Sequence, residues 1–142
     1  MSVAALEERR AKLRDAHQAA QDAQYAIDLE KLVALEEESG FGSVVKVDLR
    51  PWPQGAATMV IARVPRASEH VFKRYQSVAG SDKASGATKR EAGETFAKSC
   101  VLYPELASEL YEATVERAPG VLGHMALQLV NAVQGKETEE GK

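Results

Sequence analysis

The sequence of 142 residues contains few of the residues that build reactive or metal-binding sites, with one cysteine and three histidines. A single cysteine cannot form a disulfide within the chain, which favours a reducing compartment. Neither the cysteine nor any histidine has a neighbour at the spacing of a metal ligand set or of a nucleophile and its base. We therefore expect no enzymatic activity, no cofactor and no metal site. The residues concerned are Cys100, His17, His70 and His124.

Long apolar runs are also missing from the chain. A membrane-spanning helix needs roughly 20 apolar residues in succession, and no stretch approaches this length. At the N-terminus, acidic residues and arginines precede any apolar run, unlike in a secretion signal. We expect no membrane partner, a cytoplasmic location and, from the length, a single domain of modest core.

Charge is unevenly distributed although the net charge is only −3. Residues 1–40 carry five Lys and Arg against nine Asp and Glu, residues 41–98 carry ten against five, and residues 99–142 carry three against seven. The basic middle segment either complements the acidic flanks within the fold or binds nucleic acid. Its basic pairs lack interleaved aromatic residues and no nucleic-acid reader motif is present, so we expect no nucleic-acid partner.

The first 40 residues are typical of one long helix. No glycine or proline occurs from Val3 to Ser39, and an apolar residue recurs every seven positions. At 1.5 Å per residue this helix could reach about 55 Å, which is long for a domain of this size. It either lies across its own domain or pairs with a partner or a second copy, so we expect a homo-oligomer. The candidate oligomerisation residues are Leu6, Leu13, Ala20 and Ile27, and Ala34 continues the row.

Two strands are predicted after glycines at positions 40 and 42. "SVVKVDL" alternates apolar and charged residues, and "TMVIARV" is rich in β-branched residues. The turn "RPWPQGA" joins them into an antiparallel hairpin, whose apolar face needs helices to cover it. Trp52 in this turn either contacts a partner or folds back over the hairpin, and we favour the second arrangement.

Helices are predicted to follow the hairpin. Ser68 stands at the expected N-cap of the first, and the second runs from Thr88 to Cys100, which we interpret as a packing cysteine. Val101, Leu102 and Tyr103 are expected to fill a corner between helices, and Pro104 to occupy the first turn of the next.

In that next helix, Leu106, Leu110 and Ala113 are expected to form the inward row. The last helix, opening at "APGVLG", is expected to be buried on most faces, with Leu122, Met125, Leu129 and Val133 on its inward row. The chain therefore divides into a helical arm (1–40), a hairpin with a helical domain (41–135) and a disordered tail (136–142). The predicted class is α+β and mostly helical: a long N-terminal helix, one antiparallel β-hairpin and a bundle of about four helices.

An acidic row marks the segment after Pro104. Glutamates recur at intervals of four, three and four residues, which places them on one face of a helix. This face is interpreted as solvated, with docking of a basic partner as the alternative. The row consists of Glu105, Glu109, Glu112 and Glu116.

Three runs in succession carry a resemblance to a known family: "LEEESGFGSVVKVDL", "MVIARVPRASEHVFKRY" and "FAKSCVLYPELASELYEATVERAPGVLGHMALQLVNAVQG". In this order they resemble the tail assembly chaperones of tailed bacteriophages, over about residues 35–135. The resemblance implies a non-catalytic protein that coats the tape measure protein before the tail tube assembles, in the cytoplasm of the infected bacterium. The helix over residues 3–34 and the bulky "RPWPQG" turn depart from the family.

A tape measure protein is a long apolar and amphipathic helix until the tube encloses it, so a chaperone for it needs an adaptable apolar groove. Two other functions remain open: a structural protein of the tail or virion held by its N-terminal helix, and a small phage inhibitor of a host protein that uses the acidic row. The candidate groove residues could instead belong to the core. They are Val71, Phe72, Tyr75, Leu102, Tyr103 and Met125.

Overall fold

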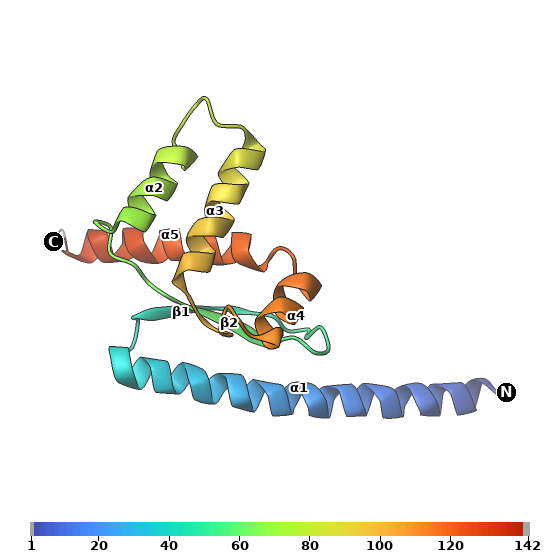
Figure 1. Cartoon of the computed structure of the whole chain (residues 1–142). Helices are drawn as coiled ribbons and strands as arrows, with labels where there is room; N and C mark the ends of the chain where they lie inside the picture. Colours follow the sequence, from blue (N-terminus) through green and yellow to red (C-terminus); the bar gives the residue numbers. More distant parts are fainter. Residues whose placement is uncertain (1, 141–142) are drawn as a thin grey trace.

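A computed structural model of the chain describes the backbone of residues 2–140 and the side chains of residues 2–135. Its elements confirm the mostly helical α+β class, with the long N-terminal helix followed by the hairpin and the later helices (Figure 1). They are α1 (Val3–Ser39), β1 (Val44–Asp48), β2 (Met59–Arg63), α2 (His70–Ala79), α3 (Gly86–Cys100), β3 (Val101–Tyr103), α4 (Glu109–Arg117) and α5 (Val121–Glu140).

Helix α1 has the predicted extent of 37 residues. At its start the Ser2 hydroxyl accepts a hydrogen bond from the Ala5 amide at 3.2 Å. It ends at Gly40, whose φ of +97° is open to glycine and strained for other residues. Its N-terminal part extends past the remainder of the molecule (Figure 1), and residues 2–16 are exposed apart from the partly exposed Ala5 and Ala11.

The sheet has three antiparallel strands in the order β1, β2, β3. β1 and β2 form the predicted hairpin, paired from Val44 with Arg63 to Asp48 with Met59. The third strand, Val101–Tyr103, corrects the prediction that these residues only fill a corner between helices, because they pair with Ile61 and Ala62. Three residues are too few to show the alternating pattern that indicates a strand.

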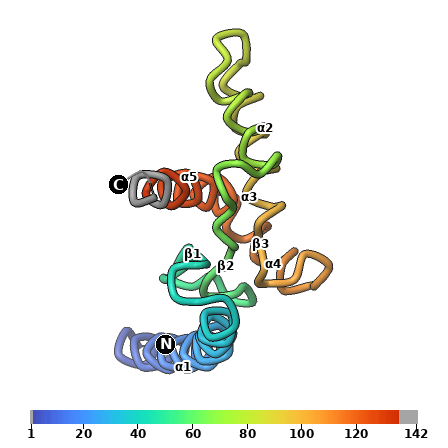
Figure 2. The backbone as a smooth tube through the Cα atoms, turned by 90° about the vertical axis from the view of Figure 1, so that its left-hand side faces the viewer, coloured from blue at the N-terminus to red at the C-terminus, as the bar shows by residue number. Residues whose placement is uncertain are grey.

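The central strand β2 is buried on both faces, which accounts for its continuous apolar run. Met59 and Ile61 pack with Leu32 of α1 on one face. Val60 and Ala62 belong to the main core on the other face, together with residues of α2, α3, α4 and α5. The sheet is thus a layer between α1 and α5, and α2 and α3 rise from the body on the side away from α1 (Figures 1 and 2).

Helices α2 and α3 begin differently from the prediction. α2 starts at His70 with Glu69 as its N-cap residue, so Ser68 is not the cap. The Glu69 carboxylate instead accepts hydrogen bonds from the Arg66 amide at 2.5 Å and from the Arg63 guanidinium at 3.2 Å. α3 starts two residues earlier than predicted, capped by Ser85.

Helix α4 also departs from the prediction. Pro104 follows a cis peptide bond and precedes the helix, which begins at Glu109 with Ser108 as its cap. Leu106 is 42% exposed, and Leu110 and Ala113 are only partly buried. The inward row of α4 consists instead of Tyr111 and Thr114.

The last helix packs on one side, not on most faces. Met125, Leu129 and Val133 are buried as predicted, but Leu127 is 60% exposed. α5 continues to Glu140, into the segment that was expected to be disordered, and residues 141–142 of that segment lie outside the described residues.

Candidate functional site

A groove of about 450 Å³ runs between α2 and α3. These two helices form a helical hairpin, distinct from the β-hairpin of β1 and β2, and we call the groove the hairpin groove. Residues three or four positions apart on a helix share one face, and both helices contribute residues at this spacing. The lining residues are His70, Val71, Arg74, Tyr75, Val78, Thr88, Glu91, Ala92, Thr95, Phe96 and Ser99.

Aromatic rings give the hairpin groove its apolar character. Phe96 is buried, and the ring of Tyr75 stacks on it with centroids 5.0 Å apart and planes 10° from parallel. Behind them Phe72 contacts Phe96 at 5.7 Å between ring centroids. This packing fixes the groove on two helices whose rings support each other.

Charged residues of opposite sign occur on the two sides of the hairpin groove, Arg74 on α2 and Glu91 on α3. The Ser99 hydroxyl donates to the Phe96 carbonyl at 2.6 Å, which commits its proton to the helix backbone. An apolar groove with a charged rim can accept the apolar side chains of an amphipathic segment and orient its charges.

The structure separates the six residues predicted to form a groove. Val71 and Tyr75 line the hairpin groove. Phe72 and Met125 are 1% and 0% exposed and belong to the core, so their assignment to a groove surface is corrected. Leu102 is 36% exposed on β3, outside the hairpin groove. Tyr103 packs beside α1 and donates its hydroxyl to Asp28.

The predicted oligomerisation residues of α1 are open to solvent. Leu6, Leu13 and Ile27 are 49%, 73% and 57% exposed, and Ala20 is partly exposed. The face of α1 that meets the body is a different one, formed by Asp28, Leu32 and their neighbours.

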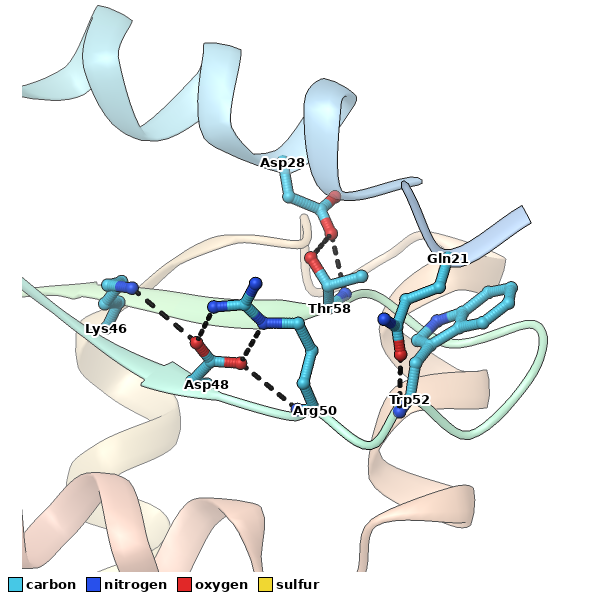
Figure 3. A network of polar contacts seen from close by, with 7 residues as sticks. All are labelled: Gln21, Asp28, Lys46, Asp48, Arg50, Trp52 and Thr58. Atoms are coloured by element: carbon cyan, nitrogen blue, oxygen red, sulfur yellow. Dashed lines mark hydrogen bonds and ion pairs between the residues drawn. The ribbon is translucent and has the colours of Figure 1, made fainter. Parts of the chain in front are cut away.

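Asp28 is fully buried between α1 and the sheet, and the sequence did not single it out. Its Oδ2 accepts hydrogen bonds from the amide and the hydroxyl of Thr58, both at 2.6 Å (Figure 3). Its Oδ1 accepts from the amide of the Gln24 side chain at 2.8 Å and from the Tyr103 hydroxyl. Its position four residues before the buried Leu32 was the only signal in the sequence.

Three of these four bonds join α1 to the sheet: two go to Thr58, which directly precedes β2, and one to Tyr103 of β3. The fourth, from Gln24, lies within α1. Each carboxylate oxygen accepts two hydrogen bonds, which is close to its capacity. A buried carboxylate with this set of partners holds elements together, and it leaves little acceptor capacity for a substrate.

Tyr103 should resist ionisation in the folded protein. Burial, together with the hydrogen bond to Asp28, raises the pKa of its hydroxyl far above the ordinary 10.0. The neutral Tyr103 hydroxyl therefore makes its full contribution to the free energy of unfolding below about pH 10. This contribution is lost as the pH rises through the raised pKa of the folded state. We expect the wild type and Tyr103→Phe to show equal phenolate absorbance at about pH 11 while folded, and to differ by one phenolate in urea. A difference in the folded state would contradict the burial of this hydroxyl.

A second group of contacts ties the hairpin turn to α1 (Figure 3). The Trp52 amide donates to the Gln21 side chain at 3.0 Å, and its indole donates to the Ala56 carbonyl at 2.5 Å. The ring of Trp52 lies 5.3 Å from that of His17 between centroids, and Trp52 is 8% exposed. Trp52 therefore folds back against the protein, as favoured from the sequence.

Arg50 bridges the end of β1 to α1. Its guanidinium donates to both Asp48 oxygens, at 2.9 and 2.6 Å, and lies 4.4 Å from the centroid of the Tyr25 ring. Lys46 Nζ lies 3.8 Å from the same carboxylate (Figure 3). The hydrogen bonds from Arg50 hold the pKa of Asp48 below its ordinary value of 3.8.

The Asp48 contacts should be visible in the acid stability of the fold. A carboxyl whose folded pKa is lowered stabilises the protein above its ordinary pKa and stops doing so as the pH falls through the lower folded value. Asp48→Asn is therefore expected to lower the urea midpoint at about pH 7 and to leave it unchanged at about pH 2. An equal difference at the two pH values would show that the loss is not electrostatic.

The structure supports the interpretation of Cys100 as a packing cysteine. Cys100 is buried, and burial raises the pKa of its thiol, which disfavours the reactive thiolate.

In the described part of the chain, no three His, Cys, Asp or Glu side chains are arranged to hold a metal ion. Among the same residues, no helix has both the length and the apolar character of a membrane span. All four glutamates of the acidic row are exposed, as expected of a solvated face, but Glu105 precedes α4 and does not share its helix with the other three.

Comparison of the chain with known protein families, with curated proteins and with solved structures finds no match.

Proposed function

We propose that this chain is a non-catalytic tail assembly chaperone of a tailed bacteriophage, acting in the cytoplasm of the infected bacterium. Its partner in this proposal is the tape measure protein, bound in the hairpin groove before the tail tube encloses it. The proposal rests on the family resemblance of residues 35–135 and on one structural observation, the apolar groove on a helical pair that projects from the body (Figure 2).

The hairpin groove suits an amphipathic helix better than a small polar ligand. The stacked rings of Tyr75 and Phe96 form part of the groove wall, and Val78 and Ala92 line the groove with them. An amphipathic helix presents apolar residues at intervals of three and four, the same spacing as the lining of α2 and α3. The charges of Arg74 and Glu91 would set the register of the bound helix.

We propose a non-catalytic function because the buried polar groups already have partners within the fold. The buried Asp28 carboxylate is occupied by four donors, and the one cysteine is buried with a raised pKa. Groups committed in this way contribute to stability and not to turnover.

A charge placed in the hairpin groove tests the proposal. Val78→Glu introduces a carboxylate into the lining at a partly exposed position, so we expect it to fold and to reduce co-purification of the tape measure protein at least about tenfold. Leu127→Glu on α5 is the matched control, since Leu127 is exposed and does not line the groove. Circular dichroism confirms that both variants are folded. If the two variants bind alike, the hairpin groove is not the binding site.

A second function is favoured by a separate observation. Leu6, Leu13 and Ile27 leave α1 with exposed apolar side chains, as expected of a structural protein that packs permanently in the tail or virion. Mass spectrometry of purified virions separates the two functions: a structural protein is present in many copies, whereas a chaperone is absent or in trace amounts.

A further inference from the structure

An apolar row on α1 remains uncovered although the helix is fully formed. It comprises Leu6, Leu13, Ala20, Ile27 and Ala34, and we call it the outer row. Leu13 and Ile27 are more than half exposed, and Ala34 is exposed. Residues 2–16 are mostly exposed, and a helical segment of this length that buries little surface is marginal in water, so a covering partner would stabilise it.

The charges of α1 identify what kind of helix would cover it. Residues 3–20 hold four basic and three acidic residues, a net charge of +1, whereas residues 21–39 hold one basic and six acidic residues, a net charge of −5. Only one of those six acids, Asp28, is buried. Two copies of α1 side by side in parallel would bring their acidic halves together, and an antiparallel pair would place each acidic half beside a basic one.

The spacing of the outer row fits the antiparallel arrangement. Leu13 and Ile27 lie seven residues to either side of Ala20, and Leu6 and Ala34 lie fourteen. A twofold axis at Ala20 therefore brings Leu13 of each copy opposite Ile27 of the other. Such an interface is closed and self-complementary, so it stops at two chains.

The outer row borders a shallow groove on the same helix. This groove lies on the C-terminal half of α1 and is lined by Ala26, Leu29, Glu30, Val33, Ala34 and Glu37. With the axis at Ala20, residues 3–14 of the second copy lie along it. Leu6 then faces Ala34, which lines this groove, and Arg10 stands at the level of Glu30.

We propose that two copies of this chain form an antiparallel dimer through the outer row of α1. Each helix then uses two faces: Asp28 and Leu32 hold it to its own sheet, and the outer row holds the second copy. This inference does not depend on the proposed function, because α2 and α3, which line the hairpin groove, lie on the other side of the sheet from α1 (Figure 2).

The oligomeric state of the full chain gives the first test. Sedimentation velocity over a range of concentrations is expected to show a dimer whose affinity falls as sodium chloride rises from about 0.05 M to about 0.5 M. Leu13→Lys should raise the dissociation constant of the dimer at least about a hundredfold, because the twofold axis creates two Leu13–Ile27 contacts and the substitution removes the leucine from each. Leu127→Lys, at a similarly exposed leucine of α5, should leave it unchanged. A monomeric wild type, or equal effects of the two variants, would overturn the proposal.

Cysteine cross-linking then distinguishes the two helix directions. In the antiparallel dimer the two Leu13 positions lie about 21 Å apart, too far for a disulfide, while Leu13 of one copy faces Ile27 of the other. A mixture of Leu13→Cys and Ile27→Cys should therefore give a mixed disulfide dimer on mild oxidation, with neither variant cross-linking alone. Cys100 is buried, so the wild type serves as the control. Cross-linking of Leu13→Cys with itself would show a parallel pair and overturn the geometry.

Discussion

Asp28→Ala is expected to lower the free energy of unfolding by about 3–5 kcal/mol. The substitution removes the acceptor of four hydrogen bonds in a fully buried place and leaves the Thr58 amide and hydroxyl and the Tyr103 hydroxyl without their partner. Urea denaturation followed by Trp52 fluorescence measures the loss, because Trp52 lies where the hairpin turn contacts α1.

Asp22→Ala is the matched control for this substitution. Asp22 is an exposed aspartate on the same helix, and it too accepts a hydrogen bond from a glutamine four residues earlier, Gln18, at 2.9 Å. Its replacement should change the free energy of unfolding by about 0.5 kcal/mol or less. Similar losses for the two variants would mean that Asp28 contributes through the helix alone, and not through the contacts that hold α1 to the sheet.

Phe72→Ala is expected to lower the free energy of unfolding by about 3–5 kcal/mol, whereas the same change at its neighbour Val71 should have little effect. Phe72 is 1% exposed and contacts Phe96 in the main core, so alanine would leave a cavity there. Val71 lines the hairpin groove and is partly exposed, so Val71→Ala should cost about 1 kcal/mol or less.

The pair also separates stability from binding on a single helix. Val71→Ala should weaken binding of the tape measure protein while leaving the denaturation midpoint nearly unchanged. Phe72→Ala should weaken this binding only to the extent that it unfolds the domain. Thermal melts beside binding measurements at a low temperature distinguish these effects. A stable Phe72→Ala protein would contradict its place in the core.

The elements predicted well from the sequence are those with a long and regular pattern. α1 shows an uninterrupted helical composition over 37 residues, and the hairpin strands show alternation or β-branched runs beside a proline-rich turn. The missed elements depend on distant partners. β3 exists because Val101–Tyr103 meets β2, some 40 residues earlier in the chain, and no local pattern reports that pairing.

The candidate site was predictable only in part for the same reason. Helical spacing places Val71, Phe72 and Tyr75 on neighbouring sides of α2, and it does not say which side meets the core and which remains open. Asp28 looked like one more charge on a charged helix, because its donors Thr58 and Tyr103 lie 30 and 75 residues away.

In the proposed dimer, one face of α1 stabilises the fold of its own chain and the other face binds the second copy. The face around Asp28 and Leu32 holds the helix to the sheet, and α1 lies on the opposite side of the sheet from α2 and α3 (Figure 2). Such a dimer would present two hairpin grooves, and the linkage between two binding modules would raise their effective affinity for one long helix.

Co-expression with the tape measure protein encoded in the same phage genome, followed by purification and native mass spectrometry, tests the proposed function most directly. We expect a soluble complex with many copies of this chain on each tape measure chain, and loss of that complex with Val78→Glu but not with Leu127→Glu. A tape measure protein that stays insoluble and binds none of this chain, while the chain itself is folded, would contradict the chaperone function.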